Sequence, residues 1–261
     1  PDHGRVLDVV DNHHVNKLYT APTAIRSLEK FGPAIFESKD LSSLRVLGSV
    51  GEPINEEAWE WYHHHVGKDR CPIVDTWWQT ETGGILISPI AYTTVLKPAF
   101  ATFPLPGVQP VLMDEKGNEI PGNGVEGNLC IKFPWPGMAR SVYGDHERFK
   151  NTYFNTYKGY YFTGDGCKRD HDGYYRITGR VDDVVNVSGH RIGTGELEDA
   201  INEHNLVVES AVVGYPHDVK GQALYAFVIC HVDDVVSEAI EKEIRTIVAD
   251  RIGPFAKPDK I

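Results

Sequence analysis

Apolar residues in the N-terminal part of the chain recur at helical spacing in three segments, which are separated by short apolar runs. The helical segments are Val6–Val15, a segment that begins at Pro22, and Asn55–Val66. The short runs, which we interpret as strands, are Lys17–Thr20, Leu44–Val50 and Cys71–Val74. Because helices and strands alternate along this part of the chain, we predict a parallel sheet with helices packed against it.

The pattern changes from Ala99 onward, where short strands are separated by turns rich in Gly, Pro, Asn and Asp. The predicted strands are Val108–Met113, Gly127–Lys132 and Gly159–Phe162. A helix is predicted over Asp145–Phe154, between the second and the third strand. Consecutive strands joined by turns favour a small β-barrel or antiparallel sheet packed on the α/β part.

A further pattern of strands and helices follows the polar residues around Asp182. Its strands are Val184–Val187, Val207–Gly214 and Ala223–His231, and its helices are Gly195–His204 and Ser237–Ile252. The predicted fold class is therefore α/β and β. Residues 1–181 form part of a large domain, and residues 182–261 form a small α+β domain. A short polar joint between two domains is where hinge rotation occurs, and we expect it at Asp182.

The composition is that of a globular protein without features that favour nucleic acid. The 261 residues carry a net charge of −11, and 41% of them are apolar and 24% charged. An acidic chain argues against nucleic acid as the main partner, although loops and helix ends can still bind phosphate. No apolar run approaches the length of a membrane span, and no signal peptide opens the chain. We therefore expect no membrane partner.

Four cysteines, Cys71, Cys130, Cys167 and Cys230, are far apart and form no CxxC pair. This spacing favours a reducing compartment over a disulfide framework or a zinc site. We expect a cytoplasmic protein, with the nucleus or the mitochondrion as alternatives. Since the chain opens on Pro1 and stops without a closing element, we also expect a fragment of a longer protein.

The polar stretch Asp75–Gly84 carries the densest candidate chemistry. It follows the predicted strand Cys71–Val74, and loops at the carboxyl ends of parallel strands are where open α/β sheets bind ligands. Its threonine hydroxyls can bond phosphate or ribose, and Glu81 can hold a cation beside phosphates. A strand that ends in a plain turn is the alternative, but a turn needs neither two adjacent tryptophans nor the polar side chains after them.

Within that stretch, Trp77–Gly83 resembles the central adenine- and phosphate-binding motif of the adenylate-forming enzymes. Its paired tryptophans resemble the AMP-forming acetyl-CoA synthetases of that superfamily. Gly51–Pro53 is similar to the family's segment along the adenine ring, and Thr163–Asp165 with Gly179–Arg180 to its ribose motif. Ser188–Gly193 is similar to the family's phosphate and CoA segment. Together these motifs span nearly the whole chain.

The side chains in these motifs suit a nucleotide. Gly51 permits close approach of a flat ligand, Asp165 can accept both hydroxyls of a ribose, and Arg180 can reach the same sugar or the phosphate. Arg191 supplies a fixed cation between glycines, and a Gly turn with a surface arginine is the alternative. The nucleotide-binding residues implied by the resemblance are Gly51, Glu52, Pro53, Asp75, Thr76, Trp77, Trp78, Gln79, Thr80, Asp165, Ile177, Arg180 and Arg191.

The resemblance also implies sites for the other substrates and for metal. Val50 and Trp78 would line the acyl pocket, where the bulk of the indole favours acetate and tolerates propionate. Glu81 and Arg191 would be catalytic, with Glu81 holding the magnesium bound to ATP. The implied CoA-binding residues are Ala21, Ser188, Gly189 and Gly193. A structural magnesium is implied near Asn202, His204 and Val207, where a plain helix end is the alternative.

The activity implied by the resemblance is that of an acetate–CoA ligase. Acetate and ATP with Mg²⁺ give acetyl-AMP and diphosphate, and CoA displaces AMP after the small domain rotates. A ligase for propionate or another short acid and a non-catalytic nucleotide-binding module are the two alternatives. The family's phosphate loop and its C-terminal lysine do not occur in this sequence. We therefore expect the chain by itself to bind AMP weakly and to lack ATP–diphosphate exchange.

Overall fold

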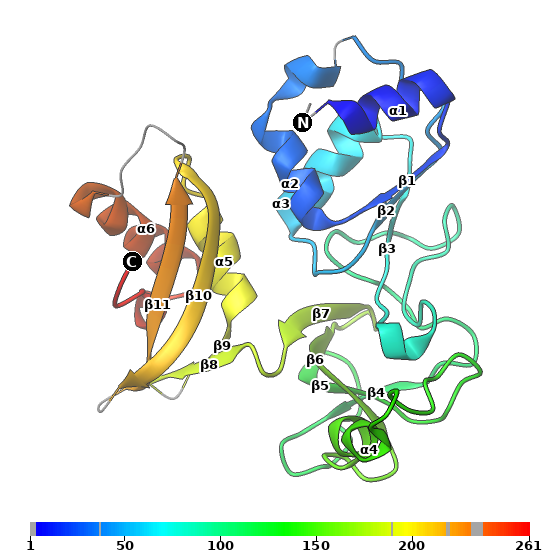
Figure 1. Ribbon diagram of the computed structural model, residues 1–261, viewed down its shortest axis with the longest axis vertical. Helices are drawn as coiled ribbons and strands as arrows, with labels where there is room; N and C mark the ends of the chain where they lie inside the picture. The colour runs from blue at the N-terminus through cyan, green and yellow to red at the C-terminus, as the bar shows by residue number, and fades with distance from the viewer. Residues whose placement is uncertain (1–3, 37, 189, 218–219, 231–236) are drawn as a thin grey trace. The chain divides into compact units, whose positions relative to one another are not determined.

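The computed structural model describes residues 4–36, 38–188, 190–217, 220–230 and 237–261 (Figure 1). The chain divides into two compact units, Pro1–Ile177 and Thr178–Ile261. The predicted boundary after Val181 falls in the turn that follows strand β7 (Tyr175–Arg180), where Asp183 N donates to Arg180 O at 3.3 Å.

A three-stranded parallel sheet with helices packed against it forms the first part of the N-terminal unit, as predicted. Its strands, in the order β1-β2-β3, are β1 (Lys17–Thr20), β2 (Val46–Ser49) and β3 (Ile73–Asp75). Its helical elements are α1 (Arg5–His13), α2 (Pro22–Lys30), η1 (Pro33–Phe36) and α3 (Glu56–Trp61). Their inward faces share one core with the strands, to which Leu7, Ile25, Leu47, Tyr62 and Ile73 contribute.

The predicted helix Asn55–Val66 is made of two different helical segments. It begins as expected, because the Asn55 side chain caps α3 by accepting a hydrogen bond from Ala58 N at 3.1 Å. After Trp61 it widens into a π-helix, η2 (Tyr62–Val66). The predicted helix therefore forms, but its last five residues are π-helical, with Tyr62 and Val66 in the core.

The second part of the N-terminal unit is an antiparallel sheet with the strand order β4-β5-β6-β7. Its elements besides β7 are η3 (Thr80–Thr82), β4 (Pro110–Met113), β5 (Val125–Ile131), α4 (His146–Phe154) and β6 (Tyr161–Arg169). Strand β6 is longer than predicted. Its side chains alternate between buried and half-buried through the Thr163–Asp165 motif, so Asp165 faces the core rather than a turn.

The C-terminal unit packs two helices and a short 3₁₀ turn against a four-stranded sheet with the order β10-β11-β8-β9. Its elements are β8 (Val184–Val187), β9 (His190–Gly193), α5 (Thr194–Asn202), β10 (Val207–His217), β11 (Gly221–Cys230), α6 (Glu238–Arg251) and η4 (Pro254–Ala256). The core of this unit includes Val187, Leu197, Leu224, Ile244 and Val248.

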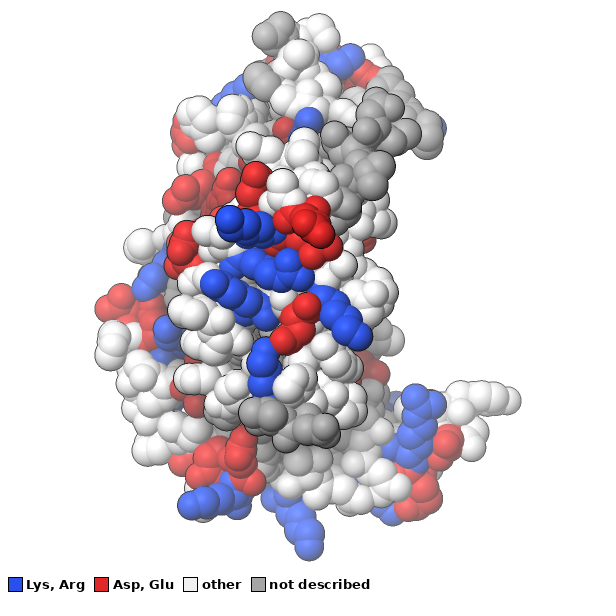
Figure 2. Space-filling model, turned by 90° about the vertical axis from the view of Figure 1, so that its left-hand side faces the viewer, with Lys and Arg blue, Asp and Glu red and all other residues white. Residues whose placement is uncertain are grey.

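The surface in Figure 2 carries Lys and Arg side chains interspersed with Asp and Glu rather than a field of one sign. On α6, Arg245 pairs with Glu241 at 2.9 Å, and Arg251 Nε donates to Glu203 at 2.7 Å. Within the described ranges, no helix combines the length and the apolar character that crossing a bilayer requires.

Candidate functional site

Three predicted site segments meet at the carboxyl edge of the parallel sheet. Thr20, Ser49 and Asp75 end their strands in register, so Ala21, Val50 and Thr76 leave the sheet side by side. Val50 N donates to Thr20 O at 3.1 Å, and Thr76 N donates to Ser49 O at 3.0 Å. The sheet thus brings the predicted CoA, acyl and nucleotide segments together at the edge where such sheets bind ligands.

A buried network joins the loop after β3 to strand β6. Trp77 Nε1 donates to Asp165 Oδ2 at 3.0 Å. Gln79 Nε2 donates to the same oxygen at 2.9 Å and to Thr163 O at 2.7 Å. Asp165 is only 6% exposed. Oδ2 of this carboxylate therefore accepts two hydrogen bonds from the protein.

The loop itself is held by further hydrogen bonds at both ends of η3. Tyr161 donates its hydroxyl proton to Gln79 Oε1 at 2.9 Å, which fixes the amide orientation. Thr82 Oγ1 accepts from Gln79 N at 3.0 Å and lies 2.8 Å from Gln79 O. Trp135 Nε1 donates to Thr82 O at 2.7 Å. The polar side chains of this loop are therefore positioned before any ligand binds.

Glu81, the predicted magnesium ligand, is held from α4. Tyr153 donates its hydroxyl proton to Glu81 Oε1. The Tyr153 ring stacks on Tyr161, with centroids 5.2 Å apart and an angle of 9° between the rings. The residue is half-buried, and Mg²⁺ in nucleotide sites uses one or two carboxylates together with phosphate oxygens, so the role of Glu81 as a magnesium ligand stays a prediction.

Asp75 is buried at the end of β3. Burial raises the pKa of its carboxyl to about 7, against the opposing effects of the Ser49 hydroxyl and the Thr76 amide. The group is therefore close to half-protonated near neutral pH. It can donate a hydrogen bond when neutral or accept hydrogen bonds when charged, and both suit the polar edge of a base.

The two adjacent tryptophans have opposite surroundings. Trp77 is 7% exposed and belongs to the core beneath the loop, whereas Trp78 is 40% exposed. Their separation follows from the extended backbone between them, which directs neighbouring side chains to opposite sides. Of the two, Trp78 is therefore the one whose indole is accessible, and its place in the acyl site stays a prediction. Thr80 is exposed at the start of η3.

Glu52 turns toward helix α2. Its Oε1 accepts hydrogen bonds from Thr23 N, at 2.6 Å, and from the Thr23 hydroxyl, and Arg26 pairs with its Oε2 at 3.2 Å. The carboxylate therefore caps the helix rather than pointing into open space. Gly51 beside it has φ of +95° and open space where a side chain would stand, so the surface offered to adenine is backbone. Pro53, in the same loop, is exposed.

The remaining nucleotide and CoA candidates lie on or near the C-terminal unit. Ile177 packs on the core beneath Trp77, at the end of the N-terminal unit. Arg180 Nε pairs with Asp182 Oδ1 at 3.1 Å, and both side chains are exposed. Gly189 lies outside the described residues, and Arg191 is described only as part of strand β9. In the same hairpin, Ser188 follows β8 and has a φ of +51°, and Gly193 ends β9 just before α5.

The predicted structural magnesium site is a helix end with its own hydrogen bonds. Leu206 N donates to His204 Nδ1 at 3.3 Å, and His204 Nε2 lies 3.0 Å from Glu243, so both ring nitrogens are engaged. Val207 N donates to His204 O at 2.8 Å. Asn202 Oδ1 is buried without a hydrogen-bond partner. A cation here would therefore be held by oxygens, not by the imidazole.

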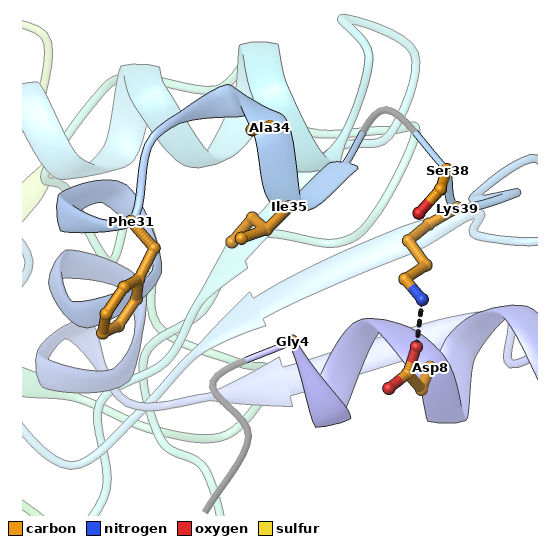
Figure 3. A pocket seen from close by; sticks show the side chains of 7 residues that line it. All are labelled: Gly4, Asp8, Phe31, Ala34, Ile35, Ser38 and Lys39. Atoms are coloured by element: carbon orange, nitrogen blue, oxygen red, sulfur yellow. Dashed lines mark hydrogen bonds and ion pairs between the residues drawn. The ribbon is translucent and has the colours of Figure 1, made fainter.

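Away from this site, a hollow of about 320 Å³ opens between α1, α2 and η1 (Figure 3). The ion pair of Asp8 and Lys39 spans one side of it, and the Phe31 ring and Ile35 line another. None of the predicted site residues lines this hollow. Across the described ranges, no three His, Cys, Asp or Glu side chains are grouped as a metal site.

Sequence reasoning missed the residues that hold the loop in place: Tyr19, Trp135, Tyr153 and Tyr161. Their aromatic character is visible in the sequence, but it indicates core packing as readily as a polar role. Only the observation that each hydroxyl or indole N–H finds a partner in the loop distinguishes the two.

Two protein families match the chain. The family described as AMP-binding enzyme matches residues 1–143, and the one described as AMP-binding enzyme C-terminal domain matches residues 196–261. Proteins named acetyl-coenzyme A synthetase are similar over all 261 residues: 60% identical in Rhizobium rhizogenes and in Rhizobium meliloti (strain 1021). Acetyl-coenzyme A synthetase 2 of Pseudomonas aeruginosa is 61% identical over the same length. The chain spans 40% of the length of these relatives.

A solved structure is also similar, that of the anthranilate CoA ligase AuaEII in complex with anthranoyl-AMP. It superimposes with a TM-score of 0.83 at 27% identity, over 99% of this chain and 48% of the other. The similarity confirms the predicted mixed architecture of a parallel sheet, antiparallel strands and a small α+β C-terminal unit.

Proposed function

We propose, from the premise that this chain belongs to the family of AMP-binding enzymes, that it is part of an acetate–CoA ligase. Identity of about 60% over the whole chain to proteins named acetyl-CoA synthetases supports this choice of substrates. The structural observation that carries the proposal is the buried network of Trp77, Gln79 and Asp165. It joins the two motifs attributed to adenine and ribose, which lie 88 residues apart, into one preorganised surface.

In the proposed first step, a carboxylate oxygen of acetate attacks the α-phosphorus of ATP. The bond from that phosphorus to the bridging oxygen breaks, so acetyl-AMP forms and diphosphate leaves. Asp165 would hold the ribose together with Arg180, the backbone at Gly51 would flank adenine, and Arg191 would bind the phosphates. Mg²⁺ held by Glu81 would supply positive charge to the phosphate oxygens.

In the proposed second step, the CoA sulfur attacks the carbonyl carbon of acetyl-AMP. The bond from that carbon to the phosphate oxygen breaks, AMP leaves with both electrons, and the thiol proton passes to solvent. Ala21 at the sheet edge and the hairpin residues Ser188, Gly189 and Gly193 would line the CoA path. Rotation about Asp182 would let one set of residues serve both steps.

The choice of acid is assigned to Trp78 and Val50, because both leave the same edge of the sheet. An indole excludes longer acyl chains sterically. Replacing Trp78 by Gly in a full-length protein that carries this chain should shift preference from acetate toward acids of four or more carbons. The measurement is kcat/KM across straight-chain acids. An unchanged preference in the variant would show that Trp78 does not line the acyl pocket. A preference of the unmutated full-length protein for propionate would favour the alternative of a ligase for propionate.

A nucleotide-binding module without catalysis is the second candidate, since the adenosine contacts need no chemistry. An assay of acetate-dependent ATP–diphosphate exchange separates the two. Nucleotide binding without exchange in the full-length protein would favour the module.

The four cysteines are all described and free, and three of them are buried. On this basis we propose a reducing compartment such as the cytoplasm.

A further inference from the structure

Tyr19 lies near the end of β1, beside the candidate loop. Its Cα pairs with that of Gly48 on β2. A Cβ added to Gly48 would lie 2.5 Å from Tyr19 Cδ2, a distance that packed side chains do not reach. Glycine at position 48 is therefore what lets the tyrosine ring lie this close to the neighbouring strand.

The Tyr19 hydroxyl belongs to a chain of three hydrogen bonds. It lies 2.7 Å from Thr76 Oγ1 and 3.1 Å from Trp78 Nε1, and Thr76 Oγ1 donates to Ser49 O at 2.8 Å. An indole N–H only donates, so the Tyr19 oxygen accepts from Trp78. The proton of Thr76 is committed to the backbone of β2, so Tyr19 donates to Thr76.

The direction of this chain is therefore fixed, from the indole N–H of Trp78 through two hydroxyls to the carbonyl of Ser49. It ties an indole that is 40% exposed, and so only partly restrained by packing, to the rigid end of a buried strand. Bonds arranged in one direction strengthen one another. Because the Thr76 hydroxyl donates its proton to Ser49 O, Thr76 helps to hold Trp78 and does not donate to a phosphate.

We propose that Tyr19 is a positioning residue that sets acid size by holding the Trp78 indole across the acyl pocket. The inference rests on the proposed function, because it takes Trp78 as a wall of that pocket. Without the Tyr19 hydroxyl the indole gains rotational freedom and a longer acyl chain finds room. The effect is on selectivity between acids and not on the chemical step itself.

The first test uses Tyr19→Phe in the full-length protein, which keeps the ring and removes the hydroxyl. Tyr174→Phe is the matched control, because the Tyr174 hydroxyl donates at 3.1 Å to Val95 O and takes no part in this series of hydrogen bonds. The ratio of kcat/KM for acetate to that for butyrate should fall about three- to tenfold in Tyr19→Phe, the effect of one hydrogen bond, and stay constant in the control.

In a Trp78→Gly background the same Tyr19→Phe change should leave the ratio unaltered, because the two residues act through one contact. An equal loss for both acids, or a changed ratio without Trp78, would overturn the positioning role. If the parental protein does not prefer acetate to butyrate, the proposed function fails instead, and the selectivity role fails with it.

A second readout is independent of the acid. The Trp78 indole N–H signal in a ¹⁵N NMR spectrum is identified by its loss in Trp78→Gly. Tyr19→Phe should speed its exchange with solvent severalfold, and Tyr174→Phe should leave it unchanged. An unaltered exchange rate in Tyr19→Phe would overturn the hydrogen-bond chain whatever substrate the protein uses.

Discussion

The loop after β3 and the β8–β9 hairpin both carry residues attributed to the nucleotide, yet the two regions hold their polar groups differently. In the loop, Gln79 is tied to Asp165 of β6 and to Tyr161, and Trp77 donates to the same Asp165. In the hairpin, Ser188 is exposed, and so are Arg180 and Asp182, which precede β8 and pair with each other.

The difference indicates two kinds of binding surface. A buried network fixes its groups at the cost of desolvating them, and it is ready for a ligand without further ordering. Exposed groups on a short hairpin cost little stability, but solvent screens them until something covers them. We infer that, in the proposed site, the loop supplies groups that are in place before the nucleotide binds. The hairpin supplies groups that act in only one of the two proposed steps. Substitutions in the loop network should therefore affect both folding and activity, and substitutions in the hairpin should affect activity alone.

All variants are made in a full-length protein that carries this chain, and the largest effect is expected from Asp165→Ala. It leaves the buried Trp77 N–H without an acceptor and removes one of the two acceptors of the Gln79 amide. The free energy of unfolding should fall by about 2–4 kcal/mol, and acetate-dependent exchange should fall at least about a hundredfold. Denaturant unfolding and the exchange assay measure the two. Asp165→Asn, which keeps one oxygen, is the control and should lose less of both. Full stability in the alanine variant would refute the network.

Asp75 should make stability depend on pH in an unusual direction. Because its pKa is raised to about 7, the folded protein holds a proton between about pH 4 and pH 7 that the unfolded chain has lost. Its stabilising contribution is complete below pH 4 and is lost as the pH rises through that range. The difference in unfolding free energy between Asp75→Asn and the parent should therefore grow by about 3 kcal/mol at most from pH 5 to pH 8. A constant difference would place the pKa near its ordinary value.

Arg191→Ala should impair activity without affecting folding. A charged contact to phosphate contributes enough to slow acetate-dependent exchange about ten- to a hundredfold. The thermal unfolding midpoint should stay that of the parent, in contrast to Asp165→Ala. Arg191→Lys keeps the charge without the planar fork and should recover part of the rate. Exchange at the parental rate in the alanine variant would move Arg191 away from the nucleotide.

The smallest effect is expected from Tyr153→Phe, which frees Glu81 Oε1 and leaves the stacked ring on Tyr161 in place. Loss of one hydrogen bond to the carboxylate should lower kcat about three- to tenfold and raise the Mg²⁺ concentration needed for half-maximal rate. Tyr160→Phe removes a surface hydroxyl bonded to Glu119 and serves as the control. An identical Mg²⁺ dependence in both variants would separate Tyr153 from the metal.

Sequence reasoning located most elements because local patterns determine them. The alternation around Lys17–Thr20 and Cys71–Val74 predicts parallel strands, and these form. The motif residues were identified by resemblance, and the sheet brings several of them to one edge. Sequence reasoning was incomplete at Tyr62–Val66, where the predicted helix is a π-helix, and along β6, which continues beyond the predicted end at Phe162.

The sequence by itself determined which segments resemble nucleotide-binding motifs, because the residue types of a motif and their spacing are local properties. Only the tertiary structure decided what each of them faces. Glu52 caps α2, and the Thr76 hydroxyl donates a hydrogen bond to Ser49 O. Asp165 accepts two hydrogen bonds from protein groups on one oxygen. Such hydrogen bonds join residues from 27 to 88 positions apart. Their partners depend on the register of the strands and on the crossing of the two sheets, and no local pattern encodes either.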